Sequence, residues 1–283
     1  MSQAHGLFTA LVSTVPKATD FGEIWELLAT GNASSSLAVG NIVSAVRPHV
    51  HRRESEVYYV MAGRGRVTVG GQTRTLGPGS AVLTPPDVAH FLVPEEPMSI
   101  LIINVPAFDP TNVEWLEGDR PDVQFSRDTW ERELATESAQ PSVPPIGRVA
   151  AAPDHIAPDG SEIRLLADAS HGATHGGLAE VFIPAGAVSQ PVAHRTVEEL
   201  WYVIEGHGHV WRSPPEAELR PVAVREGDAL VIPTQWRFQF SASADGPLRF
   251  LCVTMPPWPG SAEARELVRG GLGPATLDRG PAS

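Results

Sequence analysis

Two histidines separated by one residue, His49 and His51, are the first residues whose types and spacing favour chemistry. Side chains two positions apart on a β-strand point to the same face, so both imidazoles would project into one space. Glu56 follows His51 closely, and His90 follows the turn at Pro85–Asp87. Three neutral imidazoles and one carboxylate suit a divalent first-row metal ion and leave positions open for exchangeable ligands. The sequence therefore predicts one metal site with His49, His51, Glu56 and His90 as ligands.

Three further residues are expected to form the wall of a pocket around this metal site. Tyr58, Val60 and Leu92 share strand parity with the nearest predicted ligand, so their side chains should face the same interior. A largely apolar pocket with a metal at its base suits a flat or apolar organic molecule better than a sugar. The predicted partner is therefore a small-molecule substrate that is largely apolar.

Two residues are candidates for a direct part in catalysis. Glu56 is a predicted ligand that is also able to accept a proton. Arg47 shares parity with His49 and His51, and two interpretations of it remain open. Either it points toward the metal and clamps an anionic substrate, or it lies in solvent at the mouth of the pocket.

The elements that position these residues are predicted to be many short strands. Glycine (26 residues) and proline (27 residues) punctuate short runs rich in valine, isoleucine and aromatic residues, a pattern typical of a sandwich or barrel. The chain also repeats itself, because residues 56–63 match residues 199–206 and residues 79–85 match residues 227–233. The copies are about 145 residues apart, which predicts two barrels rather than a solenoid.

The first copy resembles two motifs of the cupin superfamily. The first motif is carried by Gly40, His49, His51, Glu56 and Gly63, and the second by Gly79, Pro85 and His90. The chain departs from the pattern at Asp87, where glycine is usual, and at Pro94, where asparagine is usual, but neither position is a metal ligand. The resemblance covers most of residues 36–108 and 175–258. It implies an all-β fold of two tandem jelly-roll barrels with a few short helices, and one divalent transition metal inside the first barrel.

The second copy has lost half of the predicted ligand set. His194 and Glu199 stand at two of the four ligand positions, whereas Val192 and Phe238 stand at the other two. A lone His/Glu pair binds metal weakly, so we predict that this degenerate barrel is metal-free. Three roles stay open for it: structural cover for exposed sheet edges, a second pocket with His194 and Glu199 as an acid/base or hydrogen-bonding pair, and residual metal binding.

The rest of the chain is assigned to segments around the two barrels. The predicted segments are an N-terminal arm (1–35), the metal-binding barrel (36–108), a linker with a short helix (109–160), the degenerate barrel (161–260) and a C-terminal tail (261–283). Short helices are predicted at residues 21–28, 128–134 and 262–269, and a proline-rich linker at residues 141–145.

Composition and charge restrict the classes of partner. The 283 residues are 42% hydrophobic and 19% charged, which is typical of a globular chain. A formal net charge of -12 repels phosphate backbones and anionic lipid, so neither nucleic acid nor membrane is an expected partner. The chain shows no apolar stretch of about 18 residues and no signal-peptide pattern, which predicts a cytoplasmic protein. The single cysteine, Cys252, is predicted to be a buried, unreactive thiol, and a homodimer is expected because small symmetric oligomers are common.

The predicted metal site supports three classes of function. The first is a metal-dependent oxidoreductase of dioxygenase type acting on a small organic molecule. The second is a redox-neutral isomerase, cyclase or decarboxylase in which the metal acts as a Lewis acid. The third is a metal- or small-molecule-binding protein without turnover. The ligand set serves all three with Fe, Mn, Ni, Cu or Zn, and the sequence does not choose the metal.

Overall fold

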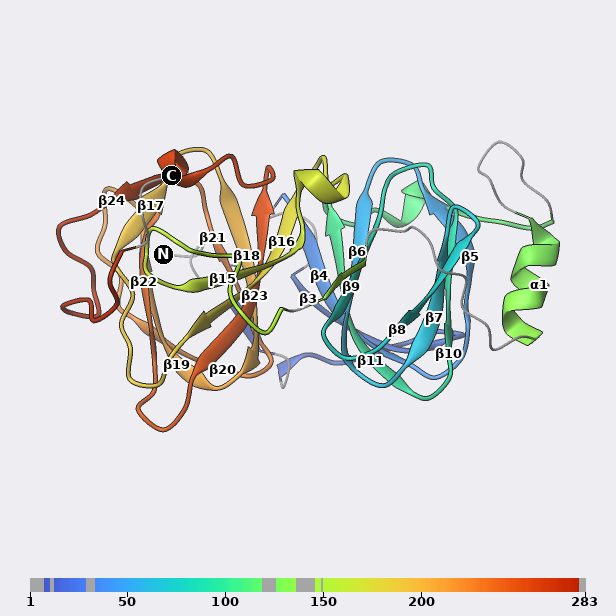
Figure 1. Ribbon diagram of the computed structural model, residues 1–283, viewed down its shortest axis with the longest axis horizontal. Coiled ribbons are helices and arrows are strands. Elements are labelled where there is room, and N and C mark those ends of the chain that lie inside the picture. The colour runs from blue at the N-terminus through green and yellow to red at the C-terminus, as the bar shows by residue number, and fades with distance from the viewer. Residues whose placement is uncertain are drawn as a thin grey trace. The chain divides into compact units, whose positions relative to one another are not determined.

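The computed structural model describes residues 8–10, 13–28, 34–118, 126–135, 146–148 and 150–279. Within these residues the chain is built mainly from β-strands and divides into two compact units (Figure 1). The unit that we call the first barrel takes in the described residues from 14 to 148 together with 170–175. The second barrel takes in the described residues up to 13, then 150–169 and those from 176 onward.

The first barrel consists of two antiparallel sheets. Its seven-stranded sheet has the order β13-β9-β6-β11-β4-β3-β2, and its five-stranded sheet has the order β12-β5-β10-β7-β8. The strands are β2 (Lys17–Ala18), β3 (Gly22–Leu28), β4 (Ser36–Ile42), β5 (Val46–His51), β6 (Ser55–Ala62), β7 (Gly65–Val69), β8 (Gln72–Leu76), β9 (Ser80–Thr84), β10 (His90–Pro94), β11 (Met98–Val105), β12 (Val113–Trp115) and β13 (Ile146–Arg148). The 3-10 helix η3 (Pro110–Asn112) precedes β12, and helix α1 (Arg127–Ala135) contacts the five-stranded sheet through Trp130, whose ring meets that of Phe91 edge to face at 4.8 Å.

The second barrel repeats this arrangement. Its sheets have the orders β1-β21-β18-β23-β16-β15-β14 and β20-β19-β22-β17-β24. The strands are β1 (Phe8–Ala10), β14 (His155–Ile156), β15 (Glu162–Ala167), β16 (Gly177–Ile183), β17 (Val192–His194), β18 (Glu198–Glu205), β19 (His207–Ser213), β20 (Val222–Arg225), β21 (Asp228–Ile232), β22 (Arg237–Ala242), β23 (Leu248–Met255) and β24 (Ala264–Glu266). The 3-10 helix η6 (Ser261–Glu263) precedes β24, and η5 (Ala169–His171) lies where the chain passes from the second barrel to residues 170–175 of the first. Because β1 pairs with β21, the first described strand of the chain completes the sheet of the second barrel.

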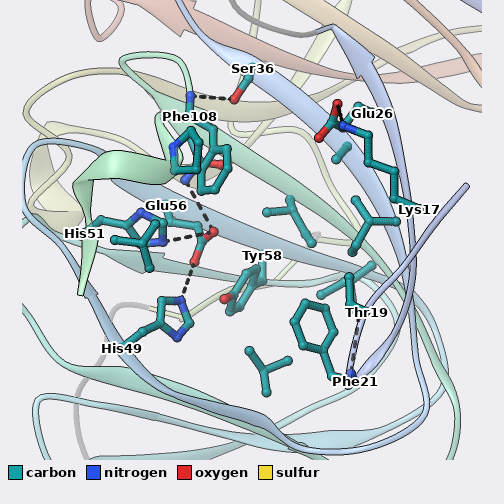
Figure 2. Close-up of a pocket in the computed structure, with 18 of the residues that line it drawn as sticks. Lys17, Thr19, Phe21, Glu26, Ser36, His49, His51, Glu56, Tyr58 and Phe108 are labelled. Carbon is teal, nitrogen blue, oxygen red and sulfur yellow. Dashed lines mark hydrogen bonds and ion pairs between the residues drawn. The ribbon is translucent and has the colours of Figure 1, made fainter. Parts of the chain in front are cut away.

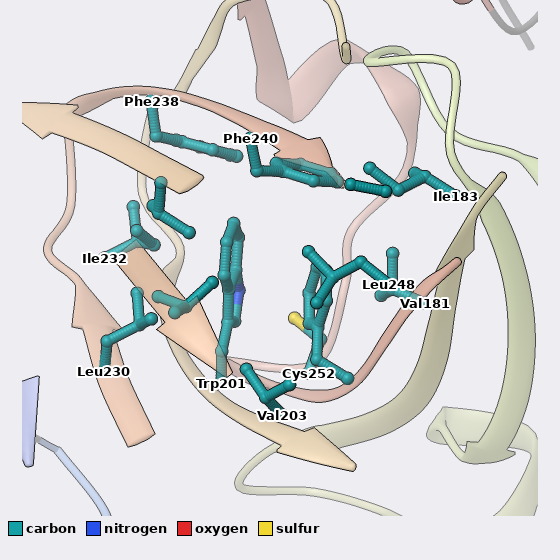
Figure 3. Packing of buried hydrophobic residues seen from close by; sticks show 14 of the residues in the cluster. Val181, Ile183, Trp201, Val203, Leu230, Ile232, Phe238, Phe240, Leu248 and Cys252 are labelled. Atoms are coloured by element: carbon teal, nitrogen blue, oxygen red, sulfur yellow. The ribbon is translucent and has the colours of Figure 1, made fainter. Parts of the chain in front are cut away.

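Each barrel encloses its own apolar core, which follows from the alternation of inward and outward side chains along facing strands. The core of the first barrel includes Ile42, Val60 and Leu92, all fully buried. The second barrel has an aromatic core in which the Trp201 ring stacks on Phe250 at 4.4 Å and meets Phe240 edge to face at 5.2 Å. Figure 3 shows the Trp201 indole among the aliphatic side chains of this core.

One turn recurs in both barrels and has an unusual backbone. Asp87 and Gln235 occupy equivalent turns and have positive φ angles of 61° and 66°. Their backbone amides donate hydrogen bonds of 2.9 and 3.0 Å to the carbonyl oxygens of His51 and His194. The positive φ explains why glycine is the usual residue at position 87, and aspartate is among the residues that tolerate it best. The departure from the motif therefore leaves the turn before His90 intact.

The structure confirms the all-β fold of two jelly-roll barrels and the helix predicted near residues 128–134. The helix predicted at residues 21–28 is wrong, because this segment is strand β3. Its apolar residues fit a helical period as well as a strand, and pairing with β4 satisfies the backbone groups of both segments. The helix predicted at 262–269 is also wrong, since β24 pairs there with β17. Residues 141–145 lie outside the described residues.

Several segments that were expected to lie outside the barrels contribute strands to them. β2 and β3 come from the predicted arm, β12 to β14 from the predicted linker, and β24 from the predicted tail. No helix in the described part of the chain is long and apolar enough to cross a membrane.

Candidate metal centre and a second cavity

The two sheets of the first barrel bring the four predicted ligands together. His49 and His51 lie on β5, and His90 lies beside His49 on the neighbouring strand β10. Glu56 comes from β6 in the facing sheet. One ligand atom from each of the four side chains lies within 4.8 Å of the others, and all four residues are buried. Figure 2 shows His49, His51 and Glu56 converging on one point of the cavity wall.

Backbone carbonyls orient two of these imidazoles. The Nδ1 atoms of His49 and His90 lie 2.8 and 3.1 Å from the carbonyl oxygens of Arg47 and Val88. A carbonyl oxygen accepts hydrogen bonds and never donates them, so each Nδ1 carries the proton. Each Nε2 is thereby left as a lone-pair donor, which is the tautomer that metal-binding histidines show when a second group holds the other nitrogen.

His51 supplies the observation that tests the fit of a metal. Its side chain is 3% exposed, and neither ring nitrogen has a hydrogen-bond partner. Its Nε2 lies 3.5 Å from Glu56 Oε1, and its Nδ1 lies 3.8 Å from Glu54 Oε2. A buried imidazole without partners is costly, and a cation between His51 and Glu56 would satisfy it. The donor set and this unsatisfied ring both fit a divalent transition metal.

The protonation states also suit a metal site. Burial, followed by the charge of His49, lowers the pKa of His90 to about 4, so this ring is neutral at neutral pH. Burial raises the pKa of Glu56, but the charge of His51 and the close contacts of the three imidazoles with the carboxylate outweigh burial and hold that pKa well below its usual value. The carboxylate of Glu56 is therefore ionised. Burial alone would lower the pKa of His51, but the negative charge of Glu56 outweighs burial, and the pKa of His51 is raised.

One neighbour holds Glu56 in place, because Asn104 on β11 donates from Nδ2 to Glu56 Oε1 at 3.3 Å. His90 Nε2, which carries a lone pair, lies 2.9 Å from Glu56 Oε2, and a metal ion bound by both would remove the repulsion between these two acceptors. Burial, followed by the charge of Glu56 and a hydrogen bond to it, raises the pKa of Tyr58 well above its ordinary value. Tyr58 is therefore a neutral phenol beside the carboxylate.

The metal cluster opens on a cavity of about 570 Å³ in the first barrel. Its described walls are mostly apolar and come from β3, β4, β5, β11 and the segment through β12; they include Phe21, Ile24, Leu28, Leu37, Ile42, Val46, Ile100, Ile102, Phe108, Val113 and Trp115. Lys17 is the one lysine or arginine among the described lining residues, and its ammonium pairs with Glu26 at 2.6 Å. Figure 2 shows this ion pair on the side of the cavity away from the histidines.

The structure separates the other residues that were predicted for this site. Tyr58 lines the cavity. Val60 and Leu92 face the barrel interior as expected, but they belong to the apolar core and do not line the cavity. Arg47 lies at the rim with 56% of its side chain exposed, paired with Asp20 at 3.0 Å and placed 4.8 Å from the centre of the Trp115 ring. Its role as a clamp for an anionic substrate stays a prediction.

Much of the cavity wall was not foreseen. Residues 17–28 and 110–115 contribute side chains to it, yet they carry no motif and lie in segments that were expected to be an arm and a linker, and Phe108 is the last residue of the predicted barrel. Phe108 meets the ring of His51 edge to face at 5.9 Å, and Trp115 lies 5.0 Å from the ring of His49. No spacing in the sequence ties these two aromatic residues to the histidines, and for Trp115 the pairing of β12 with β5 does so by placing it opposite His49.

The second barrel has a cavity of about 440 Å³ that His194 and Glu199 line. Val192 pairs with Phe238, as His49 pairs with His90, so these two residues occupy the missing ligand positions. Neither side chain has an atom that binds metal. His194 Nδ1 lies 3.5 Å from Glu199 Oε1.

Cys252 also borders this second cavity, but it is buried. Burial, followed by the charge of Glu199, raises the pKa of its thiol well above the usual value. A thiol that stays protonated is a poor nucleophile, which agrees with the predicted unreactive role.

Comparisons with known proteins agree with this architecture. A family model described as "Cupin domain" matches residues 36–104 and 179–254. An uncharacterized protein of Methanocaldococcus jannaschii is 31% identical over 105 residues, which are 37% of this chain and 80% of that protein. A solved structure of Bacillus subtilis oxalate decarboxylase, described for its Mn(II) centres, superposes with a TM-score of 0.71 at 16% identity and covers 94% of this chain and 82% of its own. Another oxalate decarboxylase structure superposes with a TM-score of 0.72 at the same identity and coverage. At this identity the structural likeness is one of fold.

Proposed function

The chain belongs to the cupin family, and we propose that its first barrel is a metal-dependent oxidoreductase of dioxygenase type. Its substrate is a largely apolar organic molecule that carries oxygen donors. The observation that supports this best is the buried three-histidine, one-glutamate cluster at the wall of a mostly apolar cavity. A cavity of this size accommodates a ring system of ordinary metabolite or drug size.

Each part of the cavity has a role in this proposal. His49, His51, Glu56 and His90 hold the metal. When bound, a redox-active divalent metal supplies Lewis acidity and electron transfer for the reaction with O₂. Tyr58 stays neutral and presents a phenol hydroxyl beside the Glu56 carboxylate. The apolar walls exclude water, and the rings of Phe108 and Trp115 offer faces against which a flat substrate lies.

A redox-neutral isomerase, cyclase or decarboxylase would use the same ligands, and oxalate decarboxylases share the fold. A small dianion such as oxalate, however, needs cationic partners. Among the described residues that line the cavity, Lys17 alone is a lysine or arginine, and Glu26 already pairs with it. This pairing favours a larger, less charged substrate over oxalate.

The test is oxygen uptake by protein reconstituted separately with Fe, Mn, Ni, Cu and Zn. Each form is given a panel of enols, flavonols and β-diketones, in air and under argon. We expect oxygen consumption with one redox-active metal, retained in His194→Ala and abolished in His51→Ala. Turnover under argon with zinc would assign the redox-neutral class. Binding without turnover under every condition would leave a non-catalytic binding protein.

A further inference from the structure

The second cavity keeps a polar centre although it has lost the metal ligands. Glu199 and His194 line it at the positions that Glu56 and His51 hold in the first barrel, and both are 6% exposed. Trp201 Nε1 donates to Glu199 Oε2 at 2.9 Å and fixes the carboxylate, as Tyr58 does for Glu56. Of the four equivalent ligand positions, Val192 and Phe238 are apolar, whereas His194 and Glu199 are polar.

This centre contains a buried ring nitrogen that has no hydrogen-bond partner. His194 Nδ1 is buried and makes no hydrogen bond, and Glu199 Oε1 lies 3.5 Å from it. The Glu199 oxygen that Trp201 does not hold and the His194 nitrogen therefore border the same point of the cavity wall. When the His194 ring carries its proton on Nε2, Nδ1 is a buried acceptor without a donor, which is costly, and an ammonium nitrogen within hydrogen-bond distance of Nδ1 and Glu199 Oε1 would satisfy both atoms.

The cavity is acidic. Asp159, Asp168 and Glu199 line it, and the described lining residues include no lysine or arginine. Asp159 is half-buried and accepts hydrogen bonds from the backbone amide and hydroxyl of Ser161 at 2.9 and 2.6 Å. Burial, with a smaller contribution from the charge of Glu199, raises the pKa of Asp159, so the two carboxyl groups sense one another. Two acidic groups in one enclosed space attract a cation.

Aromatic rings complete the walls. Trp201, Phe240, Phe250 and Trp258 line the cavity, and the ring of Trp258 lies 5.0 Å from that of His194. Aromatic faces stabilise an organic cation by cation–π attraction and bury its apolar part. Val192 also lines the cavity and supplies no ligand atom, so the same space is ill-suited to a metal ion.

We propose that the second cavity binds a small organic cation, a primary ammonium group on an apolar or aromatic body. The ammonium donates to His194 Nδ1 and Glu199 Oε1 and is neutralised by Glu199 and Asp159, while the body lies against Trp258 and Phe240. The need for N–H donors favours a primary amine over a quaternary ammonium, which has none. This site is independent of the reaction in the first barrel.

Isothermal titration calorimetry of the full-length, metal-loaded protein with phenethylamine tests the proposal. Two matched probes of similar size accompany it: 2-phenylethanol, which is neutral, and 3-phenylpropionate, which is anionic. We expect saturable binding of the amine and weaker or no binding of the other two. An N,N,N-trimethyl form of the amine separates hydrogen bonding from charge, and we expect it to bind more weakly than the primary amine.

Variants then place the site. Glu199→Gln removes one charge and keeps the acceptor for Trp201, and we expect it to weaken amine binding by at least about tenfold, as loss of a charge-assisted hydrogen bond does. Asp159→Asn provides a second variant should Glu199→Gln fold poorly. Asp245→Asn is the matched control, because it removes one exposed carboxylate that does not line the cavity. His51→Ala should leave amine binding unchanged.

Equal binding of phenethylamine and 2-phenylethanol would overturn the proposal, as would unchanged binding in both Glu199→Gln and Asp159→Asn. Loss of amine binding in His51→Ala would move the ligand to the first barrel and would also overturn it. None of these results depends on whether the first barrel consumes oxygen.

Discussion

The two barrels start from one scaffold and differ in what their cavities present to a ligand. In the first, His49 and His90 sit beside each other across β5 and β10; in the second, Val192 and Phe238 occupy the same register across β17 and β22. Both keep a buried glutamate held by an aromatic donor two residues along the strand. Two imidazoles of the first barrel are thus replaced by apolar side chains in the second, which keeps one carboxylate and one histidine at its centre.

The difference also shows which parts of a site the fold maintains. The turn before the last ligand position has a positive φ in both barrels and hydrogen-bonds to the histidine of the preceding strand in both. Strand pairing and turn geometry are therefore retained although Val192 and Phe238 stand at two of the four ligand positions. The ligands are side chains placed on this frame, so the frame does not depend on the complete ligand set.

The largest expected contrast is in metal content. His51→Ala should reduce a stoichiometry of about one metal ion per chain to near zero, because metal affinity needs the complete ligand set. His194→Ala, at the equivalent position of the second barrel, should leave the stoichiometry unchanged. Elemental analysis of the purified variants measures both. Metal loss in His194→Ala, or two ions per wild-type chain, would contradict the assignment of the second barrel as metal-free.

For the free energy of unfolding, the larger effect is expected in the second barrel and the smaller one in the first. Phe238 is 1% exposed and packs edge to face against Trp201 and His194. Phe238→Ala should lower the free energy of unfolding by about 3–5 kcal/mol, the usual cost of removing a buried aromatic ring. His90→Ala should cost metal binding first and, in metal-free protein, less stability than Phe238→Ala. Urea unfolding of both metal-free variants measures the two losses of unfolding free energy. Equal losses would show that the Phe238 ring contributes no more to the core than the His90 ring does.

A smaller contrast concerns the groups that support the ligands. Asn104 donates to Glu56 from β11, and Thr254 stands at the equivalent register in the second barrel, where it pairs with Glu199 across β23 and β18. Asn104→Ala should weaken metal affinity by about 10- to 100-fold, as loss of an outer hydrogen bond to a ligand does. Thr254→Ala should leave metal affinity unchanged. Competition with a chelator gives the affinities, and equal values for the two variants would remove Asn104 from the site.

The metal ligands could be predicted because they depend on local rules. Strand parity places His49 and His51 on one face, and the internal repeat identifies the lost positions Val192 and Phe238 without any structure. Parity does not say how far along the barrel a residue lies. Val60 therefore faces inward as predicted but sits in the core below the cavity.

The rest of both sites depends on long-range pairing that no local pattern contains. Strand β3 has an apolar pattern that also fits a helix, and its pairing with β4 puts Ile24 and Leu28 in the cavity wall. Asp159 joins Glu199 in the second cavity although about 40 residues separate them. Tertiary contacts decide such positions, which is why the acidic character of the second cavity appears only in the structure.

The smallest expected effects lie at the rim of the first cavity and decide between the two interpretations of Arg47. Arg47 and Asp20 are both more than half exposed, and such ion pairs contribute about 0–1 kcal/mol to stability. Arg47→Gln should therefore leave the unfolding free energy and the metal content nearly unchanged. Arg127→Gln, in the exposed Arg127–Glu131 pair that does not line the cavity, is the matched control.

Kinetics with a neutral and an anionic form of the same substrate then separate the roles. Because the guanidinium of Arg47 already has Asp20 and the Trp115 ring as partners, we expect KM for both forms to change by less than about twofold in Arg47→Gln. A selective rise in KM for the anionic form, absent from Arg127→Gln, would instead show that Arg47 leaves Asp20 to clamp a substrate. The mouth of the first cavity would then bind an anion, in addition to the anion-binding metal at its base. The first cavity would differ in charge preference from the acidic second cavity at two places rather than one.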